Sequence, residues 1–205
     1  MYIKGVVRMN FSETISNKLT EVITNELNYN DDKKEIIAYA IENALLIVLG
    51  SLFLVVLGYS FNALMPTVIA AIFGGSLRRV SGGAHFATPI KCLAFGSIVY
   101  SFMGVFAKKL IEYDVTNKYV LIVCLLVSFL LVAFLAPVDS EAKPIHSRSL
   151  KFKLKMSSIL FIIISFLVIS FVNNKLISVS VVLGVVYQSL TLLPFFNRKG
   201  GECRL

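Results

Sequence analysis

A histidine and a cysteine seven residues apart, His85 and Cys92, are the residues of this sequence best suited to do chemistry. An imidazole can take the proton of a thiol, and the thiolate that results is a strong nucleophile. The pair lies in a polar, glycine-rich segment at residues 78–92, which separates two long apolar stretches. The sequence therefore predicts a cysteine nucleophile with a histidine base at the edge of a membrane.

The spacing of this pair requires a break in the helix between its members. On an unbroken helix, residues seven apart lie about 10 Å apart along the axis, which is too far for direct proton transfer. Gly82-Gly83 permit unusual backbone angles, and Pro89 favours the first position of a new helix. With Thr88 as the N-cap, Cys92 falls in or beside the first turn, where the positive end of the helix dipole favours the thiolate.

Charged residues near this segment are candidates for supporting roles. Arg78 places a positive charge close to the thiol, while Arg79 and Lys143 could bind an acidic substrate. Glu42 lies near the start of the first apolar segment, where a carboxylate is costly unless it is paired or functional. It either orients His85 or forms an ordinary ion pair.

Simpler interpretations of these residues stay open. The arginines can anchor an interfacial loop at lipid headgroups, and Cys92 can be a small residue at a helix interface. His146 is a rival base. Cys124 lies in an apolar run and Cys203 in a polar tail, and no CxxC or CxxH spacing occurs. The cysteines therefore predict neither a disulfide framework nor a metal site, and no cofactor is expected.

The composition is that of a membrane protein. Of the 205 residues, 57% are hydrophobic, and the mean hydropathy is +0.79, more apolar than a soluble domain. Six apolar segments are candidates for transmembrane helices. They cover residues 37–58, 61–77, 90–107, 119–137, 156–173 and 176–196.

We therefore expect one all-α integral membrane domain over residues 1–205. Its parts are an amphipathic cytoplasmic-side segment at 1–36, a six-span bundle at 37–196 and a cytoplasmic tail at 197–205. Apolar residues at helical spacing predict an amphipathic helix within residues 10–28, followed by a polar turn at 28–34. Pro66 and Gly74-Gly75 allow the second span to be irregular or re-entrant.

The distribution of positive charge predicts the orientation. With the N-terminus in the cytoplasm, only four of the 20 lysines and arginines lie outside: Lys108, Lys109, Lys118 and Lys175. This bias places both termini and the 78–92 segment on the cytoplasmic side of the cell membrane. The net charge of +8 is not arranged in an aromatic-interleaved patch, so membrane lipid is expected as a partner and nucleic acid is not. A homodimer is compatible with a bundle of this size.

Two blocks of sequence resemble the accessory gene regulator B (AgrB) family of Gram-positive bacteria. They are RRVSGGAHFATPIKC at residues 78–92 and APVDSEAKP at residues 136–144. The resemblance implies a membrane cysteine endopeptidase that processes an AgrD-like propeptide, the precursor of a cyclic quorum-sensing signal. It assigns Cys92 as the nucleophile, His85 as its base, and Arg78 and Gly83 as supporting residues. Cys92 would release the C-terminal tail of the precursor, and the acyl-enzyme thioester would then be captured to close a thiolactone or lactone ring.

Two other functions stay open. In a small peptide transporter or exporter, the glycine-rich break and Glu42 would mark a substrate path. The six apolar segments show no evident inverted repeat to support this function. In a non-enzymatic membrane scaffold, substitutions at His85 and Cys92 would both be tolerated.

Overall fold

The computed structural model describes residues 31–83, 88–114, 116–138 and 147–196. The amphipathic helix expected within residues 10–28 lies outside these ranges, as do His85 and Lys143. The chain divides into two units, Met1–Leu52 and Phe53–Leu205. Each unit is described by itself, and the second contains the packed helices that concern the candidate site.

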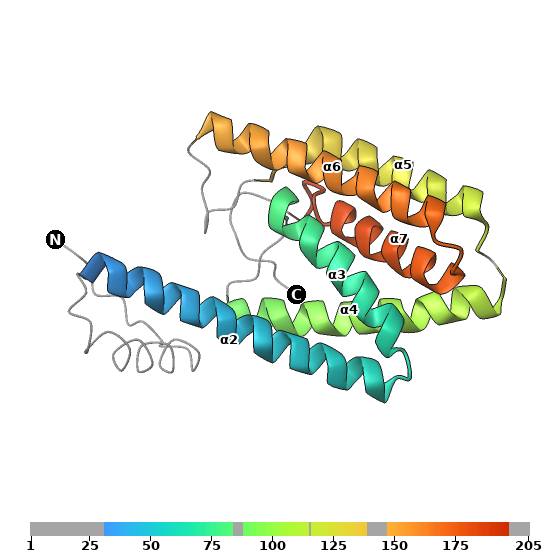
Figure 1. The fold of residues 1–205 in the computed structure, drawn as a ribbon, viewed down its shortest axis with the longest axis horizontal. Helices are drawn as coiled ribbons and strands as arrows, with labels where there is room; N and C mark the ends of the chain where they lie inside the picture. Colours follow the sequence, from blue (N-terminus) through green and yellow to red (C-terminus); the bar gives the residue numbers. More distant parts are fainter. Residues whose placement is uncertain (1–30, 84–87, 115, 139–146, 197–205) are drawn as a thin grey trace. The chain divides into compact units, whose positions relative to one another are not determined.

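Six α-helices account for the regular structure of the described residues (Figure 1). They are α2 (Asp31–Ser60), α3 (Leu64–Ser81), α4 (Pro89–Glu112), α5 (Lys118–Leu135), α6 (Arg148–Phe171) and α7 (Lys175–Leu190). Each coincides with one of the six expected apolar segments, and no strand occurs among the described residues. The prediction of an all-α membrane protein is therefore confirmed.

Three details differ from the expectations. The prediction of a polar turn at 28–34 is wrong for residues 31–34, because α2 is already helical at Asp31. Helix α6 begins at Arg148, eight positions before the apolar segment, with the side chain of Ser147 accepting the Leu150 N–H at 3.4 Å. Helix α3 is continuous, because Pro66 lies in its first turn, where the missing N–H breaks no helical hydrogen bond.

Four of the described helices are long and apolar enough to cross a membrane: residues Ile36–Ser60 of α2, and α4, α5 and α6. Helix α7 has 16 residues, which gives a length of about 24 Å at 1.5 Å per residue. Helix α3 has 18 residues but carries Arg78 and Arg79 in its last turn. The count of six spans therefore stays a prediction.

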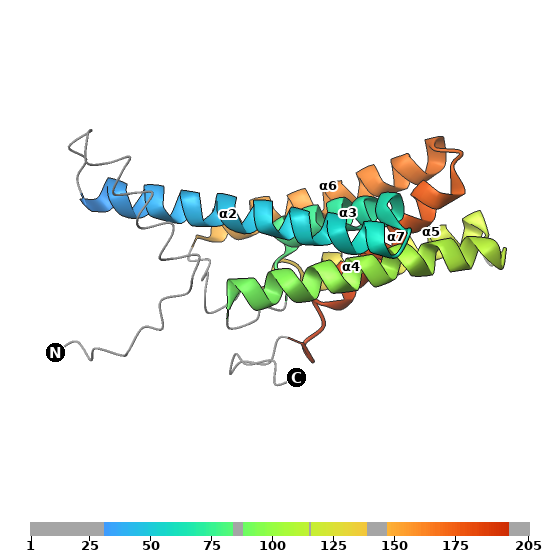
Figure 2. The ribbon, with the colours of Figure 1, turned by 90° about the horizontal axis from the view of Figure 1, so that it is seen from below.

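Helix α7 lies at the centre of the second unit. It packs against α3, α4, α5 and α6, and its contact with α3 is the most extensive between any two of the described helices. The two perpendicular views show these helices running roughly along one direction (Figures 1 and 2). Helices α3 and α7, the two that are least suited to face lipid, thus form the interior of this unit.

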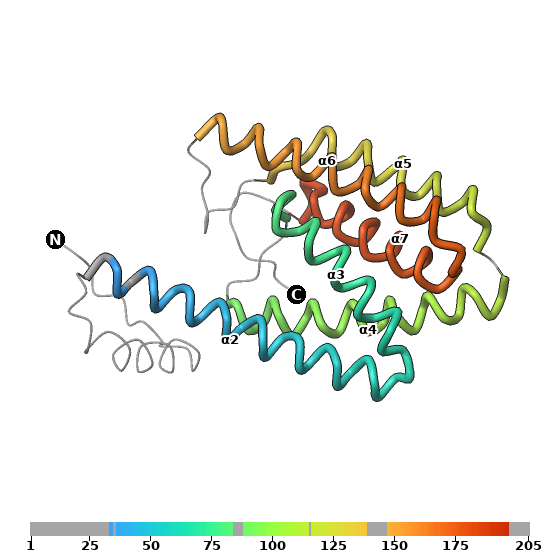
Figure 3. The backbone as a smooth tube through the Cα atoms, in the orientation of Figure 1, coloured from blue at the N-terminus to red at the C-terminus, as the bar shows by residue number. Residues whose placement is uncertain are grey.

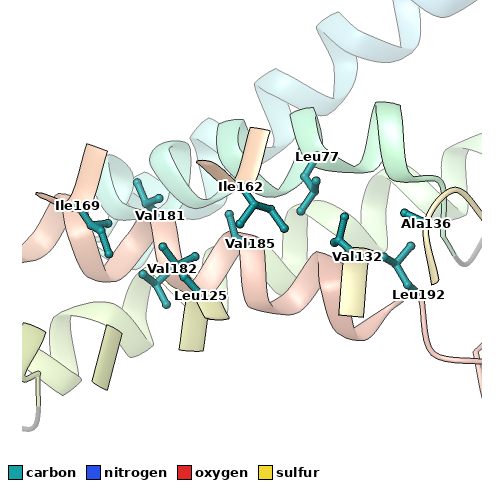
Figure 4. Packing of buried hydrophobic residues seen from close by; sticks show 10 residues of the cluster. All are labelled: Leu77, Leu125, Val132, Ala136, Ile162, Ile169, Val181, Val182, Val185 and Leu192. Atoms are coloured by element: carbon teal, nitrogen blue, oxygen red, sulfur yellow. The ribbon is translucent and has the colours of Figure 1, made fainter. Parts of the chain in front are cut away.

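The core of this unit is built from aliphatic side chains of α3, α5, α6 and α7 and of the residues that follow α5 and α7 (Figure 4). The buried members are Leu77, Leu125, Val132, Ala136, Ile162, Ile169, Val181, Val182, Val185 and Leu192. Large apolar side chains such as Phe134 and Phe171 are instead exposed, at 81% and 80%. An apolar exterior of this kind is expected of helices that are surrounded by lipid.

Small residues let the helix backbones approach closely. A Cβ on Gly184 of α7 would contact the backbone oxygen of Ala70 in α3, and one on Gly74 of α3 would lie 2.8 Å from the backbone oxygen of Gly184. Buried serines donate to carbonyl oxygens of their own helix, as Ser165 does to Phe161 at 2.9 Å. Packing through small residues is the usual way in which helices associate within membranes.

The chain reverses direction between successive helices of this unit, so their ends gather in two groups (Figure 3). One group is held by the lysines that the charge distribution places outside. Lys108 Nζ donates to the Asn62 backbone oxygen at 2.8 Å, Lys175 pairs with Asp114 at 3.0 Å, and Lys118 Nζ donates to the Ser170 backbone oxygen at 3.3 Å. The other group contains the end of α3 and the start of α4.

Candidate active site

The end of α3 and the start of α4 bring Arg78 and Cys92 together. Arg78 lies in the last turn of α3, and one of its guanidinium nitrogens, Nη2, donates to Cys92 Sγ at 3.6 Å. Both residues are half-buried. The Cys92 sulfur is thus in direct contact with a cationic side chain, an environment that is typical of reactive cysteines.

Cys92 lies at the start of α4, in the position that the sequence predicts. Thr88 has the extended backbone of an N-cap, and Pro89 occupies the first helical position. The Cys92 N–H makes an early hydrogen bond of the helix, to the Thr88 carbonyl at 3.2 Å. The Cys92 side chain therefore lies one turn into α4, near the positive end of its dipole.

The turn that leaves α3 is formed by two glycines with positive φ. Gly82 has a φ of 72° and Gly83 a φ of 136°, values that L side chains adopt at a cost. A Cβ on Gly82 would also contact the Val138 carbonyl oxygen. Val138 in turn donates its N–H to the Ser81 carbonyl at 3.0 Å. The two sequence blocks at 78–92 and 136–144 thus meet at this turn.

Gln188 of α7 holds the same turn from the interior. Its side chain is fully buried, and Nε2 donates to the Gly82 carbonyl at 2.7 Å and to Ser81 Oγ at 3.2 Å. The amide oxygen Oε1 has no hydrogen-bond partner in the described structure. A Cβ on Gly83 would lie 3.1 Å from Gln188 Nε2 and 2.9 Å from Thr191 Oγ1, so the backbone fits closely against α7.

Two tyrosines lie close to the Arg78–Cys92 contact. The rings of Tyr100 in α4 and Tyr187 in α7 meet edge to face, with centroids 5.6 Å apart. Gly74 lies one turn before Arg78 in α3. A Cβ on Gly74 would lie 2.5 Å from the Tyr100 hydroxyl. Both Arg78 and Cys92 lie within electrostatic range of these two tyrosines. Two aromatic rings are therefore close to Arg78 and Cys92.

The structure places the other predicted site residues as follows. Arg79 is exposed at the end of α3, beside Arg78. Glu42 is half-buried on the part of α2 that belongs to the first unit. His85 and Lys143 lie outside the described residues. The described residues also contain no cluster of His, Cys, Asp or Glu that could hold a metal ion.

Sequence reasoning missed Gln188, the tyrosine pair and Val138. A signal for Gln188 was present, because it is the only glutamine of the chain and lies within an apolar segment. A long polar side chain in such a segment is costly unless it has partners. The tyrosines carried no comparable signal, since aromatic residues are common in apolar helices.

Comparisons with known proteins agree on one family. The model of the family accessory gene regulator B matches residues 16–192. A protein of Clostridium perfringens strain 13 that is described as AgrB-like is 30% identical over 198 residues, covering 90% of this chain and 92% of the relative. Accessory gene regulator protein B of Staphylococcus aureus strain N315 is 25% identical over 157 residues, covering 75% of this chain and 81% of the relative. No solved structure matches the chain.

Proposed function

Because this chain belongs to the accessory gene regulator B family, and thus to the agr quorum-sensing system, we propose that it is the cysteine endopeptidase that processes an AgrD-like propeptide. The family takes part in processing of the autoinducing peptide. The finer assignment, a thiol peptidase with Cys92 as its nucleophile, is our proposal. The observation that carries it is the hydrogen bond from Arg78 to Cys92 Sγ.

Three features of the site support this role for Cys92. An arginine at the edge of a membrane protein interior is costly unless it is paired, and here it contacts the sulfur. The start of α4 adds the positive end of a helix dipole. Cys124 also lies in an apolar helix, but no hydrogen bond to its sulfur is found within the described residues. Cys92 is thus the described thiol with the environment of a nucleophile.

In the proposed reaction, His85 takes the proton of the Cys92 thiol and the sulfur attacks a carbonyl carbon at the C-terminal side of the future ring. The tetrahedral intermediate collapses, the C–N bond breaks, and His85 gives its proton to the leaving amine. The C-terminal tail departs, and the remaining peptide is bound to Cys92 as a thioester. Gly83 supports the chain reversal between Arg78 and Cys92.

Ring closure follows from the chemistry of the thioester. A cysteine thiol of the peptide attacks the thioester carbonyl, its proton passes to His85, and the bond to Cys92 sulfur breaks. This exchange of one thioester for another is nearly neutral in energy, whereas attack by water would lose the activated acyl group. A site that excludes water therefore favours cyclisation over hydrolysis.

The proposal includes the surroundings of the site. Both termini and the site face the cytoplasm in a multi-pass arrangement, and Arg79 and Lys143 attract an acidic precursor tail. Glu42 orients His85 or pairs with a cation. A homodimer in the lipid bilayer is compatible with this arrangement.

The decisive experiment is to express the chain with its cognate propeptide and to follow the release of the C-terminal tail. Cys92→Ala should abolish cleavage, and Cys92→Ser should reduce it severely because an alcohol is a weaker nucleophile at neutral pH. Cys124→Ala and Cys203→Ala are the matched controls and should cleave normally. Cleavage by Cys92→Ala would overturn the proposal and favour a transporter or a scaffold.

The role of His85 is tested in the same assay. His85→Ala should remove cleavage while the amount of protein in the membrane stays the same, because a general base contributes to the reaction and not to the fold. A parallel loss of cleavage and of membrane protein would instead assign His85 to the structure.

A further inference from the structure

We propose that Gln188 is a positioning residue of this peptidase site, which fixes the turn between Arg78 and Cys92 through the Gly82 carbonyl. The inference rests on the proposed function and adds to it a residue from α7, a helix that supplies none of the groups in the proposed reaction. It concerns how the site is held, since Gln188 is fully buried and acts through the backbone of the turn.

The first argument is the set of atoms that Gln188 binds. The carbonyl of Gly82 follows directly on α3, and the Gly82 N–H donates to the Arg78 carbonyl at 3.0 Å. Gln188 Nε2 donates to this Gly82 carbonyl at 2.7 Å and to Ser81 Oγ at 3.2 Å. One amide group therefore holds both the last residue of α3 and the first residue of the turn.

The second argument is that this amide is incompletely satisfied. Gln188 Oε1 is buried without a hydrogen-bond partner in the described structure, and burial of an unpaired carbonyl oxygen is unfavourable. An apolar side chain of the same length would avoid this cost if the position only filled space. The amide at this position is explained by its two donated bonds, which an apolar residue cannot make.

The third argument is the fit of the turn against α7. A Cβ on Gly83 would lie 3.1 Å from Gln188 Nε2 and 2.9 Å from Thr191 Oγ1. The Thr191 hydroxyl donates back to the Gln188 carbonyl at 2.7 Å, which fixes the end of α7. The turn thus rests on a surface that Gln188 and Thr191 form together.

These contacts set where the chain leaves α3. They thereby set the position of Arg78 relative to the start of α4. Without the amide, the Gly82 carbonyl loses its donor and two glycines with positive φ can adopt other angles. The guanidinium of Arg78 would then meet Cys92 less often in the reactive geometry. A small misplacement of reacting groups lowers the rate of the chemical step much more than it lowers substrate binding.

The test uses the full chain in membranes with its cognate propeptide. Gln188→Met retains the length of the side chain but cannot donate to Gly82. We expect the kcat of cleavage to fall by about tenfold or more, with KM and membrane abundance within about twofold of the parent. The matched control is Ser189→Ala, because Ser189 is equally buried on α7 and its hydroxyl donates only within its own helix, to the Val185 carbonyl at 2.8 Å. Ser189→Ala should leave kcat unchanged.

A second readout is the rate at which a maleimide alkylates Cys92 in a Cys124→Ala, Cys203→Ala background. Gln188→Met should change this rate by about threefold or more, because the Arg78 contact is disturbed, whereas Ser189→Ala should not. If Gln188→Met does not accumulate, Gln188→Glu replaces it, since its protonated carboxyl can still donate one bond to Gly82. The Gln188→Glu variant should still cleave the propeptide, with a kcat below that of the parent.

The outcomes separate the two proposals. Cleavage by Cys92→Ala, run in parallel, overturns the peptidase itself. If Cys92→Ala is inactive but an accumulated Gln188 variant has normal kcat and normal alkylation of Cys92, only the role of Gln188 is overturned. Failure of both Gln188 variants to accumulate also overturns it, because the residue is then a determinant of folding.

Discussion

At the scale of single residues, the contact between Arg78 and the Cys92 sulfur is the central feature of the candidate site. The contact of 3.6 Å joins a permanently charged guanidinium to a thiol that is half-buried. We predict that Arg78→Gln slows alkylation of Cys92 at neutral pH by about tenfold, because the variant loses the cationic group that contacts the sulfur and holds it at the start of α4. Maleimide labelling of membranes from the Cys124→Ala, Cys203→Ala background measures this rate.

Arg79→Gln is the matched control for this prediction. Arg79 has the same charge and lies beside Arg78, but its side chain is exposed at the end of α3. Screening by solvent weakens its field at the sulfur, so Arg79→Gln should change the labelling rate by less than about twofold. An equal effect of both substitutions would show that the general charge of this surface, and not the Arg78 contact, governs the thiol.

The sequence predicted part of this site because some residues have strong local preferences. Proline favours the first position of a helix and glycine allows positive φ, so the start of α4 and the turn at Gly82-Gly83 could be inferred from neighbours alone. Gln188 could not be inferred in this way. Its bond to Gly82 joins residues 106 positions apart, and such a contact depends on how α7 packs against α3.

At the scale of elements, the turn after α3 depends on the absence of a side chain at Gly83. We predict that Gly83→Ala destabilises the turn by about 1–3 kcal/mol, because its φ of 136° disfavours an L residue. Its Cβ would also crowd Thr191 Oγ1 at 2.9 Å. Loss of propeptide cleavage, together with a lower temperature of heat-induced aggregation in detergent, measures the effect.

Gly75→Ala provides the comparison. A Cβ on Gly75 of α3 would meet no atom within 4 Å, and the residue lies inside a regular helix. Alanine is better than glycine in helices by about 0.5–1 kcal/mol, so this variant should be as stable as the parent or more so. If Gly75→Ala and Gly83→Ala were equally harmful, the turn would have no special role.

The crossing of α3 and α7 carries a separate prediction. Gly184→Val should prevent close approach of the two helices, because even a Cβ there would meet the backbone oxygen and carbon of Ala70. Overpacking of an interior costs about 1–3 kcal/mol, and backbone atoms cannot move aside as a side chain can. The expected result is loss of folded protein in detergent. Gly96→Val in α4, where a Cβ would meet no atom within 4 Å, should retain it.

Hydropathy predicted the number and order of the described helices but not their ends. It reports the length of chain that can lie in lipid, and a helix can continue into water beyond that length. Helix α6 illustrates this, since it begins at Arg148 and includes three lysines before its apolar part. Hydropathy also did not show that α3 and α7 would be interior, because packing of small residues at Gly74 and Gly184 decides that arrangement.

At the scale of the whole molecule, three of the four lysines that charge counting places outside connect helix ends and turns at one end of the second unit. Lys175 pairs with Asp114 at 3.0 Å, and Lys108 donates to the Asn62 carbonyl at 2.8 Å. The remaining turns carry most of the positive charge, including Arg148 at the start of α6. Because positive charge is preferred in the cytoplasm, we predict an orientation with Cys92 on the cytoplasmic side.

This orientation is tested with single cysteines in a chain that lacks its own three. Tyr113 is 71% exposed at the end of α4, and Ser149 is exposed at the start of α6. Tyr113→Cys should react with a membrane-impermeant maleimide in intact cells, whereas Ser149→Cys should react only after the cells are permeabilised. The reverse pattern would place the Arg78–Cys92 contact outside the cell, where a cytoplasmic propeptide could not reach the thiol before export.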